Sequence, residues 1–134
     1  MTNFPPMVDQ VRFFAGAARV LDGRAAGEYM TGFTSMIRRE PVGVIGQATP
    51  WNYPLLMAIW KFIPAIAAGN AVILKASETC PRTHEIIVEA FAEAGFPEGV
   101  VNVVTNAPAD AGEVVGALID APAVKRINFT GSTA

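Results

Sequence analysis

Residues 71–104 read AVILKASETCPRTHEIIVEAFAEAGFPEGVVNVV, and this stretch decides the fold class. The apolar run at 71–74 predicts a short buried strand, and the β-branched run at 100–104 predicts another. Between them, residues 83–94 place apolar side chains on one helical face and glutamates on the other. A strand, a helix and a strand in this order predict a βαβ unit with parallel strands.

The same alternation continues on both sides of this unit. Upstream, residues 42–45 predict a strand, and residues 54–68 predict a helix that begins at a proline and is kinked at Pro64. Downstream, residues 109–119 predict a helix and residues 124–129 predict a fourth strand. The order βαβαβαβ therefore predicts an α/β fold, in which a parallel sheet carries helices on both faces.

The first 40 residues have a different pattern. Apolar residues at helical spacing from Val11 predict an amphipathic helix that stops near Gly23, and period-two alternation over 29–37 predicts an extended strand or arm. We therefore expect a helix and an arm over residues 1–40 and a partial α/β domain over residues 41–134.

Composition excludes several functions. Hydrophobic residues are 51% of the chain and charged residues 16%, which is too apolar for a disordered chain. The net charge of -2 gives no basic surplus for nucleic-acid binding. With Cys80 and His84 as the sole cysteine and histidine, no disulfide framework, cysteine-based zinc site or two-histidine metal motif is expected. The sequence has no secretory signal and no uninterrupted apolar run long enough to span a bilayer. We therefore expect a cytoplasmic protein without a membrane partner.

Polar loops follow the predicted strands at 49–52, 75–78, 105–108 and 130–133. Ligands of parallel α/β sheets bind beyond the carboxyl ends of the strands, so these loops form the candidate site. No GxGxxG or Walker A pattern follows a strand. The Gly-Ser-Thr sequence from Gly131 suits either a bound phosphate or an ordinary turn.

Single residues in these loops allow two interpretations each. Lys75 and Glu78 suit either the hydroxyls of a ribose or a solvated pair at a helix start. Asn52 suits either an oxyanion donor or a helix N-cap. We interpret Cys80 as structural and expect His84 on a helix surface rather than acting as a base.

Ordered motifs resemble the aldehyde dehydrogenase superfamily across nearly the whole chain. The matching stretches include PWNYP at 50–54, AAGN at 67–70, KASE at 75–78, AGFP at 94–97 and FTGST at 129–133. The resemblance implies a Rossmann-like domain that lacks the usual glycine fingerprint. One departure is Asn106, which stands where many members have glycine, and asparagine tolerates a positive φ.

The family's roles transfer to matching residues. Asn52 would be the side-chain donor of the oxyanion hole, and Lys75 and Glu78 would hold the adenosine ribose of NAD, with NADP also possible. No metal is implied. The rest of the cofactor cleft would be formed by Thr49, Pro50, Trp51, Ser77, Gly112, Phe129 and Ser132.

The implied activity is NAD(P)-dependent oxidation of a small-molecule aldehyde to a carboxylic acid through a cysteine thiohemiacetal. The family's Gly-Gln-x-Cys and Glu-Leu-Gly-Gly stretches are missing from this sequence, so we expect an inactive fragment of a homodimeric or homotetrameric enzyme. Residues 12–19 and 37–41 resemble aminoaldehyde dehydrogenases, and residues 105–111 resemble salicylaldehyde dehydrogenases. The alternatives are a stand-alone nucleotide-binding or interaction module and an inactive truncated remnant.

Overall fold

The structure is a computed structural model that describes residues 4–23 and 27–132. Its helices and strands, including two short 3₁₀ turns (η), follow the alternation that the hydrophobic pattern predicts. In chain order they are α1 (Phe4–Ala17), η1 (Ala18–Val20), β1 (Val44–Ala48), α2 (Pro54–Ala67), β2 (Ala71–Lys75), α3 (Pro81–Glu93), β3 (Val101–Val104), η2 (Pro108–Asp110), α4 (Ala111–Asp120) and β4 (Val124–Phe129).

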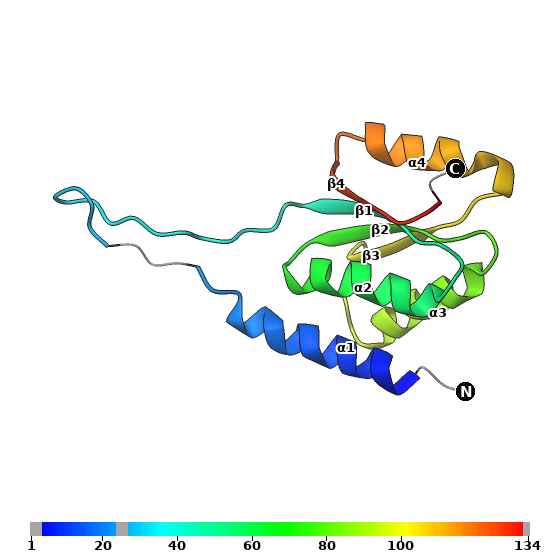
Figure 1. Ribbon diagram of the computed structural model, residues 1–134, viewed down its shortest axis with the longest axis horizontal. Helices are drawn as coiled ribbons and strands as arrows, with labels where there is room; N and C mark the ends of the chain where they lie inside the picture. Colours follow the sequence, from blue (N-terminus) through cyan, green and yellow to red (C-terminus); the bar gives the residue numbers. More distant parts are fainter. Residues whose placement is uncertain (1–3, 24–26, 133–134) are drawn as a thin grey trace.

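The four strands form one parallel sheet in the order β3-β2-β1-β4. The first two crossovers move in one direction along the sheet, and the third returns to the other side of β1. Because such crossovers are right-handed, this reversal places α2 and α3 on one face of the sheet and α4 on the opposite face. Figure 1 shows this layering, with α1 lying outside α2. The predicted parallel sheet with helices on both faces is confirmed.

β1 begins two residues later than the apolar run predicts. Gly43 has a φ of 122°, and the backbone N–H groups of Val42 and Gly43 donate to Asn70 Oδ1 at 2.7 and 3.0 Å. Asn70 comes from the turn between α2 and β2, 27 residues away from Gly43. This contact fixes the backbone where the chain enters the sheet, so the ladder starts only at Val44.

The hydrophobic core lies between the sheet and helices α2 and α3. Val72 and Leu74 of β2 are 0% and 1% exposed, and Phe62 of α2 is 1% exposed. The ring of Phe62 meets that of Phe91 edge to face, with centroids 5.4 Å apart. Phe62 and Phe91 lie in the second halves of these helices, so this contact joins α2 to α3 on one face of the sheet.

The segment from 27 to 43 leaves the body as an extended arm (Figure 1). Met30 and Phe33 form an isolated antiparallel bridge, but no strand of regular length lies within 29–37. The predicted extended course is present, whereas the predicted strand is not. An extended segment forms a stable strand only beside a neighbour that satisfies its backbone groups, and the body supplies none at the arm.

Candidate functional site

The register of the sheet brings the ends of the strands to one level. Ala48 of β1 pairs with Lys75 of β2 and Phe129 of β4, and Lys75 pairs with Val104 of β3. The polar loops predicted from the sequence therefore leave the sheet side by side at its carboxyl edge. This edge is where parallel α/β sheets bind their ligands.

Lys75, the last residue of β2, forms an ion pair with Glu78 in the loop that follows. Lys75 Nζ lies 3.1 Å from Glu78 Oε2, and the side chains are 9% and 31% exposed, respectively. A hydrogen bond from its own backbone N–H, and then the Lys75 contact, lower the pKa of Glu78, so its carboxylate is ionised at neutral pH. The buried lysine does not fit the interpretation as a freely solvated pair.

Ser77 and Cys80 build the turn that leads from this pair into α3. Ser77 is buried, its Oγ accepts the Thr79 N–H at 3.3 Å, and its carbonyl accepts the Cys80 N–H at 3.1 Å. Burial raises the pKa of the Cys80 thiol. A protonated thiol is a poor nucleophile, which agrees with a structural role for this cysteine.

The loop after β1 presents Asn52 without engaging its side chain. The N-cap of α2 is Tyr53, which has a φ of 51°, and no side chain caps this helix. Within the described part of the chain, the Asn52 amide makes no hydrogen bond, so it does not act as the N-cap. Trp51 beside it is 66% exposed. The amide N–H groups of Asn52 are therefore free to donate to a ligand.

His84 is not on the helix surface, so that expectation is wrong. Its side chain is fully buried, with Nε2 3.1 Å from Thr49 Oγ1 and Nδ1 3.2 Å from the Cys80 carbonyl oxygen. Burial lowers the pKa of His84 and keeps the ring neutral. The spacing held a signal, because position 84 shares a helical face with Ile87 and Phe91, both of which contribute to the core.

Lys61 is a second buried polar group, and the sequence did not predict a role for it. It is 5% exposed and donates from Nζ to Asn128 Oδ1 at 2.7 Å and to the Asn128 carbonyl at 3.2 Å. Desolvation lowers its pKa. Gln47 Nε2 donates to the Lys61 carbonyl at 2.9 Å, and Gln47 Oε1 is buried without a partner among the described residues. The burial of Lys61 was indicated in the sequence by its position within the apolar helical run 54–68.

The other predicted residues border the same edge. Gly112 lies in the first turn of α4, and Phe129 ends β4. A Cβ at Gly131 would lie 2.6 Å from Phe129 Cζ, so the ring rests directly on this turn, which continues into the exposed Ser132. Asn106 does not use the positive φ that its type tolerates, because Tyr53 is the sole non-glycine residue with a positive φ within 4–23 and 27–132.

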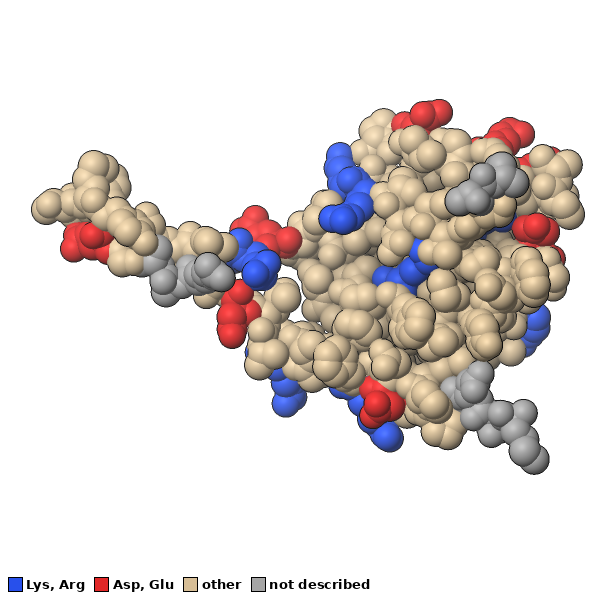
Figure 2. Space-filling model, in the orientation of Figure 1, with Lys and Arg blue, Asp and Glu red and all other residues tan. Residues whose placement is uncertain are grey.

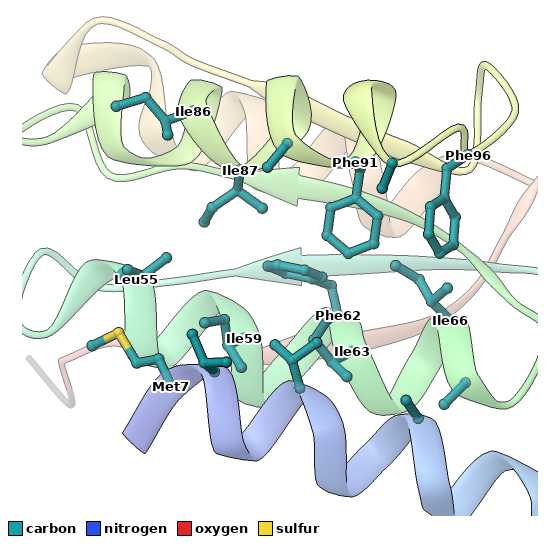
Figure 3. Close-up of a pocket in the computed structure, with 16 residues that line it drawn as sticks. Met7, Leu55, Ile59, Phe62, Ile63, Ile66, Ile86, Ile87, Phe91 and Phe96 are labelled. Carbon is teal, nitrogen blue, oxygen red and sulfur yellow. The ribbon is translucent and has the colours of Figure 1, made fainter. Parts of the chain in front are cut away.

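An apolar hollow lies elsewhere, between α1, α2 and α3 (Figure 3). It has a volume of about 460 Å³ and is lined by apolar side chains, among them Met7, Ile63 and Ile87. None of the residues predicted for the site lines it. The hollow is therefore a groove in the helical layer and is separate from the polar edge of the sheet.

The structure also bears on metal and membrane binding. Within residues 4–23 and 27–132, no group of three or more potential metal-binding side chains forms, and no helix is long and apolar enough to span a membrane. On the face shown in Figure 2, basic and acidic groups are scattered and form no continuous basic surface.

The sheet order and the polar loops at its carboxyl edge define a Rossmann-like α/β domain. Its family is identified by sequence: the chain belongs to the aldehyde dehydrogenase family, whose profile matches residues 1–134. The resemblance seen in the ordered motifs is therefore confirmed.

Known proteins of this family are similar along almost the entire chain. A vanillin dehydrogenase of Pseudomonas fluorescens is 42% identical over 125 residues, which are 93% of this chain and 26% of that protein. The crystal structure of a salicylaldehyde dehydrogenase from Pseudomonas putida G7, complexed with salicylaldehyde, has a TM-score of 0.89 at 36% identity and covers 95% of this chain and 27% of its own. The NAD+ complex of an aldehyde dehydrogenase from Bacillus cereus has a TM-score of 0.85 at 37% identity, with coverages of 95% and 25%. The chain thus spans about a quarter of the length of the relatives it matches.

Proposed function

We propose that this chain is the cofactor-binding part of an enzyme that oxidises an aldehyde to a carboxylic acid with NAD. One observation carries the proposal. The Lys75–Glu78 ion pair and the free amide of Asn52 follow two neighbouring strands, at positions that the register holds at one edge of the sheet.

The chemistry of the ion pair fits the adenosine ribose of NAD. An ionised Glu78 accepts hydrogen bonds from ribose hydroxyls, and Lys75 donates to them. The negative charge of Glu78 also repels a 2′-phosphate, so we infer a preference for NAD over NADP. The remaining loops would line the dinucleotide through Thr49, Pro50, Trp51, Ser77, Gly112, Phe129 and Ser132. The NAD+ complex of the Bacillus cereus relative supports this choice of cofactor.

Asn52 would act on the substrate. When bound, NAD supplies the acceptor for the hydride that leaves the substrate carbon. As a nucleophile adds to the aldehyde, the carbonyl oxygen gains negative charge, and an N–H of Asn52 donates to that oxygen. The donor is effective because no hydrogen bond to the described residues has to be broken first.

The nucleophile is proposed to come from another part of the enzyme. Cys80 is unsuited to the role, because its thiol pKa is raised and its Sγ faces the backbone carbonyl of Trp51 at 4.0 Å. A cysteine and a general base outside this sequence would form and hydrolyse the covalent intermediate. By itself, the 134-residue chain is therefore expected to bind NAD without oxidising an aldehyde.

The arm is proposed to join copies of the enzyme into a dimer or tetramer. Tyr29, Phe33 and Met36 are 80%, 62% and 70% exposed, so the arm presents apolar surface that a second subunit would bury.

For the substrate we propose an aromatic aldehyde, supported by the names of the vanillin and salicylaldehyde relatives.

Two measurements test this function. Isothermal titration calorimetry of the chain with NAD should give saturable binding, and its absence would refute the cofactor proposal. In the complete enzyme, Asn52→Ala should lower kcat for a benzaldehyde roughly 10²–10³-fold, and should leave the Kd for NAD unchanged. Saturable NAD binding by a natural protein that oxidises no aldehyde would favour the stand-alone nucleotide-binding module.

A further inference from the structure

The loop that carries Asn52 has few anchors of its own. Pro50 has no backbone N–H, and the side chains of Trp51 and Tyr53 are 66% and 62% exposed. Tyr53 adopts a left-handed φ of 51° directly before Pro54, a position where a helical-type backbone is disfavoured. Neither burial of its side chains nor relaxed backbone geometry therefore fixes the loop beyond Thr49.

At the far end of the loop, the Tyr53 carbonyl accepts the Met57 N–H at 2.9 Å. At the near end, the anchor of Thr49 is His84. A carbonyl oxygen only accepts hydrogen bonds, so His84 Nδ1 must carry the proton that it shares with the Cys80 carbonyl at 3.2 Å. Nε2 of the neutral ring is then an acceptor, and the Thr49 hydroxyl donates to it at 3.1 Å. Each polar atom of the fully buried ring has one partner, and the two bonds together fix the orientation of the ring.

The same contacts link two loops of the candidate site. Cys80 accepts the hydrogen bond from His84 Nδ1 with its carbonyl oxygen. Its backbone N–H donates to the Ser77 carbonyl at 3.1 Å. Its thiol also lies 4.0 Å from the Trp51 carbonyl, at the limit of a weak hydrogen bond. Thr49 in turn donates its backbone N–H to the Lys75 carbonyl at 3.3 Å. A continuous series of contacts therefore runs from the Lys75–Glu78 loop through His84 to the Asn52 loop.

We propose that His84 is a positioning residue, which orders residues 50–53 through Thr49 and thereby holds Asn52 at the carboxyl edge of the sheet. The catalytic consequence rests on the proposed function, in which Asn52 contacts the substrate and Pro50 and Trp51 line the cofactor. The ordering of the loop itself does not depend on that function.

Hydrogen–deuterium exchange of the unliganded protein tests the ordering. The His84→Leu variant retains a side chain of similar size but removes both bonds, and Thr49→Val removes only the bond between the loop and the ring. Two amides at the ends of the loop report its order, because the Thr49 N–H donates to the Lys75 carbonyl at 3.3 Å and the Met57 N–H donates to the Tyr53 carbonyl at 2.9 Å. Both variants should raise the exchange rates of the amides at positions 49 and 57 roughly 2- to 12-fold, the factor that corresponds to one neutral hydrogen bond. Thr49→Ser restores the hydroxyl and should restore slow exchange.

Ile87→Ala is the matched control, because Ile87 is buried in the same helix but makes no hydrogen bond to the loop. It should lower the thermal unfolding midpoint without affecting the exchange of the Thr49 and Met57 amides. Should the exchange of these two amides be the same in the His84→Leu, Thr49→Val and Ile87→Ala variants, the positioning role is overturned.

Titration with NAD separates this inference from the proposed function. If the wild-type protein binds NAD, His84→Leu should raise the Kd by a factor similar to its effect on exchange, and Ile87→Ala should not. A wild-type protein that binds no NAD refutes the proposed cofactor, and the exchange rates still decide the role of His84. Unaltered NAD affinity in His84→Leu, combined with unaltered exchange, refutes the positioning role alone.

Discussion

Replacing Glu78 by glutamine tests how the site distinguishes its cofactors. The carboxylate is ionised at neutral pH, because hydrogen bonds from its own backbone N–H and from Lys75 lower its pKa. A hydrogen bond to a charged group contributes about 1.5–3 kcal/mol and a neutral one about 0.5–1.5 kcal/mol. The exchange to an amide should therefore cost about 1–1.5 kcal/mol of NAD binding, which raises the Kd about 5- to 13-fold.

The same change should improve the binding of NADP. In the wild-type protein, Glu78 Oε2 lies 3.1 Å from Lys75 Nζ and neutralises its charge. In the Glu78→Gln variant, the buried ammonium is left without a counter-ion and attracts the 2′-phosphate, while the repulsion from the carboxylate is gone. We expect NADP affinity to rise about tenfold. This factor is at the lower end of the interaction energies of charged pairs, because Glu78 is partly solvated.

Isothermal titration calorimetry with both dinucleotides measures the two effects together. The ratio of the NADP and NAD dissociation constants should fall by about two orders of magnitude, one from each change. Glu85→Gln is the matched control, because it removes an equal charge from the α3 surface, where Glu85 pairs with Arg82. A ratio in Glu78→Gln that stays within twofold of the wild-type and control values would refute the role assigned to Glu78.

Three further predictions follow from the packing, the buried histidine and the arm. Phe62→Ala should lower the free energy of unfolding by about 3 kcal/mol in urea titrations, because the ring is 1% exposed but borders a groove that can partly relax; a loss below about 1 kcal/mol would contradict the described core. Burial lowers the pKa of His84, so the unfolded chain binds the proton more tightly than the folded one. Stability is then highest above the unfolded pKa of about 6.5 and declines as the pH falls through the lower folded value. His84→Gln should flatten this decline between pH 7.5 and 5, and an equally steep decline in the variant would exclude His84 as its source. Finally, Phe33→Asp combined with Met36→Asp should shift assemblies toward monomers in analytical ultracentrifugation, whereas an unchanged distribution would argue against the arm as the interface.

Local periodicity predicted most of the fold. The bounds of β4 agree with the predicted residues 124–129, and β2, α2, α3 and β3 lie within two residues of their predicted starts. These elements bury continuous apolar runs or stripes, which are visible in the sequence itself. The start of β1 could not be predicted, because it depends on the hydrogen bonds from Val42 and Gly43 to Asn70, which lies 28 and 27 residues away along the chain.

The site shows the same division between local and long-range information. Lys75, Glu78 and Asn52 were identifiable because each follows a predicted strand, and the register then brings them to one edge. The buried ring of His84 has its hydrogen-bond partner in Thr49, which is 35 residues away along the chain. The burial of Lys61 likewise involves Asn128, 67 residues further on, whose carbonyl and side chain accept its protons. Neither partner has a local signature.

The location of the cofactor is the central claim, and hydrogen–deuterium exchange with and without saturating NAD tests it most directly. We predict that NAD slows exchange in residues 49–52, 75–79 and 129–132 and leaves the groove between α1, α2 and α3 unchanged. Protection confined to that groove, at residues 7–15, 59–67 and 86–96, would contradict the account, as would uniform exchange along the chain at saturating NAD.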